Sequence, residues 1–362
     1  MRVLHVIARL NVGGTARYIT QLANELPNHG IETFVATGFV QGLEVEDPSA
    51  ETIEVIRIPA LGRAINPIRD YLAQKQLRNI INAVKPDLIH THTFKAGYIT
   101  RATKVSVPVI HTFHGHLLND PEFSGFKSKI IIGVEKFLAR KTFKLITVGE
   151  IVGEELQKNG IGMKEQYLSI APGVKPLDIT ARAEALRNLG LTNNGEPIIG
   201  WIARVTGVKN PMLVLKIATM MPNAHFIIAG GGDLLESVKA AAPRNVSVLG
   251  WTKAEDLFGV SDIILSTSEN EGMPIALIEA QLGGKPVVAT DVGSVAEVIS
   301  NDVTGIITSK SAESIVSALE SLLDDKERSA AMGCLAKSRA QDLFSIERMI
   351  NAHVVLYNSI VK

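Results

Sequence analysis

Short runs of β-branched and aliphatic residues alternate with helical patterns along the whole chain, and this alternation constrains the fold more than any other feature. It is typical of parallel α/β architecture, in which a crossover helix follows each strand. The predicted strands of the first half are 3–7, 33–37, 54–58, 88–92, 107–113 and 145–148. Those of the second half are 198–203, 225–229, 246–249, 263–266, 286–290 and 304–307.

The segment 171–180, APGVKPLDIT, interrupts the alternation with two prolines and a glycine and is typical of a linker. With 362 residues, the chain is long enough for two domains that each bury a core. We therefore expect an α/β fold of two facing, doubly wound parallel sheets. They would span 1–170 and 171–344, with a binding cleft between them. A terminal helix over 345–362 is expected to pack back on the first domain.

Composition excludes several classes of protein. The 37 basic and 37 acidic residues cancel, so no overall field attracts nucleic acid, and we expect no nucleic-acid partner. The single cysteine, Cys334, excludes internal disulfides and fits a reducing compartment. The first apolar run is too short for a signal peptide, and no run approaches the roughly 18 apolar residues of a membrane span. The expected location is cytoplasmic, either free or peripheral at the inner face of the cell membrane.

A glycine pair, Gly13 and Gly14, lies between the first strand and the first helix, with Thr15 as the expected N-cap. Glycine there lets backbone amides approach a phosphate at a helix N-terminus. G-x-G-x-x-G is absent, and the second strand ends without the acid that would hold an NAD ribose, so an NAD oxidoreductase is disfavoured. A tight turn without a ligand remains the alternative, and the triplet 230–232 is a signal of the same kind.

Two cations follow the first strand of the second half. Arg204 comes directly after it, and Lys209 lies on the next loop. Such a pair suits a diphosphate, since arginine offers a bidentate fork and lysine a point charge. The alternative is a solvated loop with two surface charges.

The stretch 274–282 reads as an apolar helix with one charge, Glu279. Pro274 is expected at its first helical position, and Glu271 lies just before it. A buried carboxylate needs a partner. The two hydroxyls of a ribose would satisfy it, and so would a nearby Arg or Lys.

Taken together, these residues resemble a known family. The segment from Glu271 to Glu279 is similar to the E-x7-E signature of retaining glycosyltransferases of the GT-B fold, specifically family 4. The resemblance also covers Gly13 and Gly14, the histidine-containing runs 87–92 and 111–116, and the pair Arg204 and Lys209.

The resemblance implies a role for each matching position. Glu279 would bind the ribose of a nucleotide sugar, and Glu271 with the amides of Gly272 and Met273 would contact the donor sugar. The remaining assignments concern the diphosphate, the sugar and the base: Arg204 and Lys209 would neutralise the diphosphate, Gly13 and Gly14 would close over it, His114 would lie beside the sugar, and Gly250 with Trp251 would border the base.

The resemblance also implies a reaction. A sugar, with UDP the favoured carrier, would pass with retention to a hydroxyl acceptor, including a lipid-linked one, in polysaccharide or glycolipid synthesis at a bacterial-type cell surface. No D-x-D motif occurs in the sequence, so no metal or other cofactor is expected. A silent nucleotide-binding relative should lack some of the motif residues, yet all are present.

Two further patterns suggest other functions. His90, His92, His111, His114 and His116 fall near the ends of predicted neighbouring strands, which also suits a metal-dependent hydrolase, although no carboxylate lies at ligand spacing among them. The segment 126–144 places six cations among Phe and Ile with Glu135 as its one acid. It predicts either peripheral contact with an anionic membrane or a core-packed helix with a solvated face.

Overall fold

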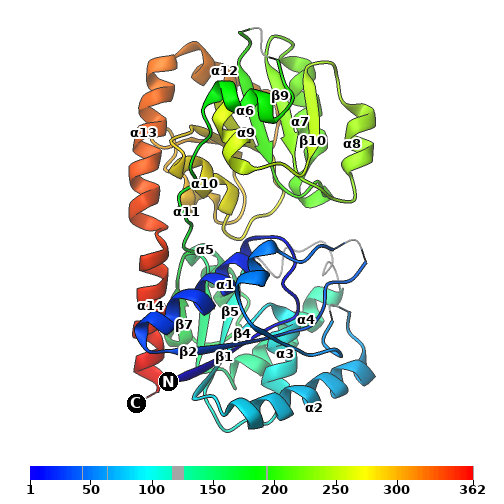
Figure 1. The fold of residues 1–362 in the computed structure, drawn as a ribbon, viewed down its shortest axis with the longest axis vertical. Coiled ribbons are helices and arrows are strands. Elements are labelled where there is room, and N and C mark those ends of the chain that lie inside the picture. The colour runs from blue at the N-terminus through cyan, green and yellow to red at the C-terminus, as the bar shows by residue number, and fades with distance from the viewer. Residues whose placement is uncertain (43, 63, 116–125, 193–194, 362) are drawn as a thin grey trace. The chain divides into compact units, whose positions relative to one another are not determined.

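The computed structural model describes residues 1–42, 44–62, 64–115, 126–192 and 195–361, and the side chains of all of these except 126 and 127. The chain forms two compact units, the first Met1–Gly173 with Ile346–Lys362 and the second Val174–Ser345. Each contains one parallel sheet flanked by helices (Figure 1). The predicted α/β class with two parallel sheets is therefore confirmed.

The sheet of unit 1 has seven strands in the order β3-β2-β1-β4-β5-β6-β7. The order reverses between β1 and β4, which defines a doubly wound sheet. The strands are β1 Arg2–Ile7, β2 Glu32–Thr37, β3 Val55–Arg57, β4 Leu88–His92, β5 Val109–Phe113, β6 Lys144–Thr147 and β7 Tyr167–Ser169. The helices are α1 Gly14–Glu25, α2 Pro67–Val84, α3 Phe94–Ala102, α4 Phe126–Ala139, α5 Glu150–Lys158 and α14 Ile346–Ile360, with 3-10 turns at Leu26–His29, Pro48–Thr52 and Lys164–Gln166.

Alternation along β1 explains why helices cover both faces of this sheet. Val3 and Ile7 belong to the apolar cluster that also contains residues of α1 and α14. Leu4 and Val6 belong to the cluster on the opposite face, with residues of α2 and α3. Successive strand residues point to opposite faces, so β1, which is buried on both sides, is apolar at four of its five buried positions. The terminal helix α14 contacts α1 and so completes the core of unit 1.

The sheet of unit 2 has six strands in the order β10-β9-β8-β11-β12-β13 and reverses between β8 and β11. The strands are β8 Ile198–Ile202, β9 His225–Ala229, β10 Val246–Gly250, β11 Ile263–Ser266, β12 Val287–Thr290 and β13 Ile306–Thr308. The helices are α6 Arg182–Asn188, α7 Pro211–Met220, α8 Leu235–Ala241, α9 Ala254–Val260, α10 Ile275–Leu282, α11 Val295–Val298, α12 Ala312–Asp324 and α13 Lys326–Leu343, with a 3-10 turn at Gly207–Lys209.

Three local expectations were wrong. Gly13, not Thr15, is the N-cap of α1. Pro274 is the N-cap of α10 and does not occupy its first turn. The short strand β7 was missed because its three residues are half-buried or exposed and carry no apolar run. Among the described residues, no helix has the length and apolar character required to cross a bilayer.

Candidate active site

The loops that follow β8 and β11 in unit 2 are joined by an ion pair. Lys209 Nζ lies 2.5 Å from Glu271 Oε1, and the Ser268 hydroxyl donates to the same oxygen at 2.7 Å. The Lys209 and Glu271 side chains are only 18% and 11% exposed. Lys209 is therefore not the solvated loop cation of one sequence interpretation, and Glu271 is held in place before any ligand arrives.

Backbone contacts fix the two loops against each other. Thr267 Oγ1 lies 3.0 Å from the carbonyl oxygens of both Lys209 and Asn210, and it accepts a hydrogen bond from Trp201 Nε1 at 3.0 Å. Asn210 has a left-handed backbone, with φ of 48°, and its side chain caps α7. A satisfied network of this kind restricts the positions available to the Lys209–Glu271 pair.

Arg204 lies on the loop after β8 and is exposed. The glycine triplet after β9 packs directly on this loop. A Cβ at Gly230, whose φ is +129°, would lie 1.9 Å from the Ala203 carbonyl oxygen, and one at Gly232 would lie 2.3 Å from that of Val205. The triplet is thus required by a close approach of two backbones, an explanation that needs no ligand.

Trp251 presents its ring beside the same loops. It is 61% exposed, and a Cβ at Gly231 would lie 2.4 Å from its indole nitrogen. The preceding Gly250 has a φ of +74°, and its carbonyl accepts the Gly230 amide at 2.6 Å. Unit 2 therefore brings an exposed aromatic face close to the loop that carries Arg204.

The helix α10 begins just beyond Gly272 and Met273. Glu279 lies just over one turn into the helix and is 7% exposed. The helix ends as expected at Gly283 and Gly284, where the left-handed Gly284, with φ of +72°, allows the Lys285 amide to reach the Ala280 carbonyl at 2.9 Å.

In unit 1 three histidine rings form a series in which the ring nitrogens of neighbouring members lie within hydrogen-bond distance. His114 directly follows β5, and its Nε2 lies 3.0 Å from His92 Nδ1 at the end of β4. His92 Nε2 in turn lies 3.1 Å from Nδ1 of His5 on β1. His5 and His92 are fully buried, and His114 lies at the partly buried end of the series.

The terminal helix α14 supports this series. His353 Nδ1 lies 2.8 Å from the Met349 carbonyl, an acceptor, so Nδ1 carries the proton of the neutral ring. Its Nε2 then accepts from the Tyr18 hydroxyl at 3.0 Å. The Tyr18 ring stands edge-on to His114, with ring centres 5.0 Å apart and planes at 86°. Two elements from opposite ends of the chain thus support one side of His114.

Burial keeps these rings neutral. It lowers the pKa of both His5 and His114 to about 3 and that of His353 to about 4, with a further lowering of the first two by His353. Burial also lowers the pKa of His92, with the neighbouring rings adding to the effect. A charged imidazole here would lack solvent.

The other predicted histidines differ from expectation. His90 and His111 lie within β4 and β5, not at their ends, and His116 lies outside the described residues. His90 is hydrogen-bonded at both nitrogens, to Tyr357 and Thr112, each at 2.6 Å.

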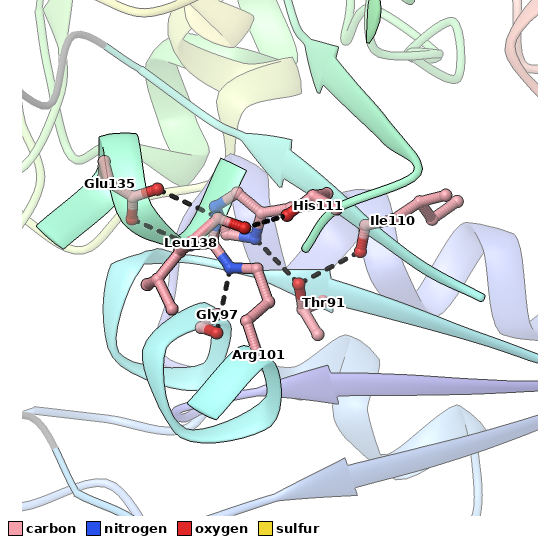
Figure 2. Close-up of polar contacts among 8 residues, drawn as sticks. Thr91, Gly97, Arg101, Ile110, His111, Glu135 and Leu138 are labelled. Atoms are coloured by element: carbon pink, nitrogen blue, oxygen red, sulfur yellow. Dashed lines mark hydrogen bonds and ion pairs between the residues drawn. The ribbon is translucent and has the colours of Figure 1, made fainter. Parts of the chain in front are cut away.

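His111 lies beside a buried ion pair, shown in Figure 2. Arg101 of α3 binds both carboxylate oxygens of Glu135 on α4, at 2.8 and 2.9 Å, with neither side chain exposed. Arg101 Nε also donates to the Gly97 carbonyl at 3.0 Å. The one acid of segment 126–144 therefore points inward, and the exposed face of α4 keeps its cations.

The first glycine loop, which contains Gly13 and Gly14, already has a carboxylate as a hydrogen-bond partner. The Gly13 amide donates to Asp47 Oδ2 at 3.2 Å, and Asp47 also caps the turn Pro48–Thr52 through the Ser49 amide at 3.0 Å. Gly14 is the first residue of α1. A phosphate would have to share or displace this carboxylate at Gly13, which the sequence did not indicate.

Four residues of the histidine cluster were missed from the sequence: His5, Tyr18, His353 and Tyr357. His5 could have been noticed as the one polar residue inside the apolar run of β1. His353 and Tyr357 are four residues apart, so they share one face of α14. Among the described residues, a set with ring nitrogens close enough to share a metal is His5, His90 and His92, which differs from the predicted set.

The candidate residues divide between the units, with Gly13, Gly14 and His114 in the first and the others in the second. Residues 12–174 match the Glycosyltransferase Family 4 model, and residues 183–339 match the model of Glycosyl transferases group 1.

Individual proteins agree with these matches. The chain is 25% identical to an Escherichia coli UDP-Gal:alpha-D-GlcNAc-diphosphoundecaprenol alpha-1,3-galactosyltransferase, over 90% of this chain and 89% of that protein. Its fold resembles sucrose-phosphate synthase of Thermosynechococcus elongatus, with a TM-score of 0.85 at 18% identity over 99% of both chains. It also resembles HepE of Anabaena in complex with UDP and glucose, with a TM-score of 0.82 at 18% identity over 99% of this chain and 100% of that one.

These matches cover both units and set aside the metal-dependent hydrolase. The chain belongs to glycosyltransferase family 4 and is a retaining, nucleotide-sugar-dependent glycosyltransferase of the GT-B fold.

Proposed function

We propose that the protein transfers a hexose from a UDP-sugar to a hydroxyl of a lipid-linked acceptor, without a metal, in cell-surface polysaccharide or glycolipid synthesis. The E. coli relative is described as using UDP-galactose and a diphosphoundecaprenol acceptor, and HepE binds UDP and glucose. Unit 2 is assigned to the donor and unit 1 to the acceptor.

The observation that carries the donor assignment is the Lys209–Glu271 pair at 2.5 Å beside the loop of Arg204. An arriving diphosphate competes with Glu271 for the Lys209 ammonium, and the freed carboxylate can then accept a hydroxyl of the sugar. Arg204 is exposed and supplies a second cation. Glu279 is assigned to the ribose hydroxyls, Gly272 and Met273 to the sugar through their amides, and Gly250 with Trp251 to the base.

The chemistry follows from where charge develops. As the anomeric carbon–oxygen bond breaks, negative charge grows on the departing diphosphate, and preorganised cations stabilise that state more than the ground state. Lys209 and Arg204 supply this charge. In the retaining reaction that we propose, the acceptor hydroxyl attacks from the face that the diphosphate leaves and gives its proton to a diphosphate oxygen. His114 contacts the donor sugar.

A thermal-shift screen of UDP-, GDP- and ADP-sugars tests the donor. A ligand at 100 times its Kd stabilises the folded state by about 2.7 kcal/mol, so a UDP-sugar should raise the melting temperature of unit 2 clearly. A larger shift with GDP- or ADP-sugars would refute the UDP assignment. If no nucleotide sugar stabilises the protein, the residue assignments fail as well.

Variants separate the roles within unit 2. Glu279→Gln should weaken binding of UDP itself, whereas Glu271→Gln should not weaken UDP binding and should weaken the sugar-dependent part. Lys209→Met should lower kcat by about a hundredfold to a thousandfold, the usual cost of one preorganised group that stabilises developing charge. Lys239→Met is the matched control because Lys239 pairs with Glu236 on the exposed face of α8.

Dialysis against EDTA should not change the rate of sugar transfer. Recovery of lost activity by added Mg²⁺ or Mn²⁺ would contradict the metal-free proposal.

The outer faces of α2 and α4 support a peripheral membrane contact. Phe137 of α4 is 55% exposed beside Lys136 and beside Arg140 and Lys141, which directly follow the helix, while Glu135 is buried against Arg101. Apolar side chains among unopposed cations suit an anionic lipid surface.

The same arrangement recurs on α2. Ile68 is 76% exposed beside Arg69, and the acid Asp70 is buried with its carboxylate 2.6 Å from Lys95 Nζ on α3. Both helices therefore turn an acid inward to a cation of α3 and leave cations and apolar groups outside.

Sedimentation with phosphatidylglycerol vesicles tests this contact, with phosphatidylcholine vesicles as the reference. Binding should be salt-sensitive and should fall several-fold in Phe137→Ser. Leu335→Ser is the matched control because Leu335 is similarly exposed on α13 of unit 2. Equal binding to both lipids, or equal loss in both variants, would remove the membrane contact from the proposal.

A further inference from the structure

The hydrogen bonds of the three-histidine series in unit 1, His5, His92 and His114, run in one donor-to-acceptor direction. That direction decides whether His114 presents an N–H or a lone pair to a ligand. The series joins β1, β4 and the end of β5 through two ring-to-ring contacts of 3.1 and 3.0 Å. Each contact needs one donor and one acceptor, and a neutral imidazole has one of each. Once the proton of one ring is placed, the protons of the other two follow.

His5 sets the direction because its second nitrogen is buried. His5 Nε2 has no hydrogen-bond partner within the part of the chain that the structure describes. If the proton were on Nε2, a buried N–H would lack an acceptor, and orphaned buried N–H groups are rarer in proteins than under-satisfied acceptors. The favoured arrangement puts the proton on Nδ1 and leaves only a lone pair unpaired at Nε2.

The remaining steps follow by hydrogen-bond balance. His5 Nδ1–H donates to His92 Nε2, so the proton of neutral His92 is on Nδ1 and is donated to His114 Nε2. His114 must then carry its own proton on Nδ1. We propose that His5 and His92 are positioning residues that hold His114 as an Nδ1–H donor toward the substrate, and that His114 does not act as a base.

This inference rests on the proposed function for what His114 contacts, but the tautomer itself does not. In the proposed reaction, an Nδ1–H would donate to an oxygen of the donor sugar or diphosphate. A base at His114 would require the opposite direction through all three rings. The neutral state of the series is supported by burial, which holds the pKa of each ring far below neutrality.

A metal would use the same rings differently. His5, His90 and His92 place ring nitrogens within 4.8 Å of one another. A bound ion would need the lone pair of His92 Nε2, which accepts from His5 in this series, and a lone pair of His90, both of whose nitrogens are already bonded to Thr112 and Tyr357. The donor series and a zinc site therefore exclude each other and are distinguished by one experiment.

Two-bond ¹⁵N–¹H correlation spectra of the ¹⁵N-histidine-labelled full chain at neutral pH report each tautomer directly. We expect a protonated Nδ1 and an unprotonated Nε2 for His5, His92 and His114. A protonated Nε2 at His114 would overturn the proposal. Addition of one equivalent of zinc should leave these signals unchanged, and a stoichiometric shift of the His5 and His92 nitrogens would overturn it too.

Variants at His5 connect the tautomer to activity. His5→Val removes the donor, and His5→Asn keeps an N–H near the Nδ1 position. His5→Val should mix the tautomers of His92 and His114 and lower kcat about tenfold, the rate equivalent of one hydrogen bond, with the Kd for UDP unchanged. His5→Asn should restore both readouts. Equal loss in both folded variants would mean a packing role only. If no nucleotide sugar binds the wild-type protein, the proposed function fails while the tautomer measurement still decides the direction of the series.

Discussion

Unit 1 should be far more sensitive to acid than unit 2, because its core contains neutral histidines. Five of them, His5, His90, His92, His111 and His353, are at most 1% exposed. Burial lowers the pKa of each from the ordinary 6.5, to about 3 for His5 and about 4 for His353, and well below 6.5 for the other three. The unfolded chain therefore binds more protons than the folded one at any pH between these values and about 6.5.

The sign and size of the effect follow from this difference. The part of the unfolding free energy that depends on keeping these histidines neutral is fully present above about pH 7. It falls as the pH drops through 6.5, at about 1.4 kcal/mol per pH unit for each histidine. At pH 5.5 five such groups remove roughly 7 kcal/mol, which compares with a total of roughly 5–15 kcal/mol for a typical domain. Unit 1 should therefore lose most of its stability within about one pH unit below 6.5.

The chain contains its own reporters for the two units. All five tyrosines are in unit 1, and both tryptophans, Trp201 and Trp251, are in unit 2. In urea titrations at pH 7.5, 6.5 and 5.5, the unfolding of unit 1 should appear as an early loss of far-UV circular dichroism, and its midpoint should move to a lower urea concentration as the pH falls. The tryptophan emission reports on unit 2, and its midpoint should stay at a nearly constant urea concentration.

Substitution of one buried histidine tests how much each of the five contributes to this pH dependence. His353→Gln should lower the pH slope of the unfolding free energy of unit 1 by about 1.4 kcal/mol per pH unit, even if the variant is less stable at pH 7.5. His29→Gln is the control, since His29 is exposed in the same unit. The reasoning is refuted if both variants keep the wild-type slope, or if unit 1 is equally stable at pH 7.5 and 5.5.

Two further predictions concern the cores. Arg101→Leu should destabilise unit 1 by about 3–5 kcal/mol by stranding Glu135, and the double change Arg101→Met with Glu135→Leu should recover most of that in urea unfolding; a double variant no better than the single one would contradict this. In unit 2 a Cβ at Gly333 would lie 2.2 Å from the Gly284 carbonyl oxygen, so Gly333→Ala should cost about 1–3 kcal/mol by tryptophan-detected unfolding, while Cys334→Ala on the exposed face should cost little.

Much of the fold could be read from local pattern. The strands 88–92, 225–229 and 263–266 were predicted at their observed bounds because apolar runs between turn signals are a property of neighbouring residues. The carboxyl ends of the strands predicted at 198–203 and 107–113 then indicated where Arg204 and His114 would lie. Where the local pattern was weak, as in β7, the prediction failed.

The contacts that define the candidate site needed the tertiary structure. Lys209 and Glu271 are 62 residues apart, His5 and His92 are 87 apart, and Tyr18 and His353 are 335 apart. Residue type and spacing indicated that Lys209, Glu271 and His92 carry chemistry, but not which residues they meet, and gave no indication of the others. The order of strands in the sheet and the return of α14 decide that, because they bring together segments whose local sequences are independent. The periodicity of the chain therefore determined the two sheets, whereas the ion pair at Lys209 and the direction of the histidine series depend on packing between distant segments.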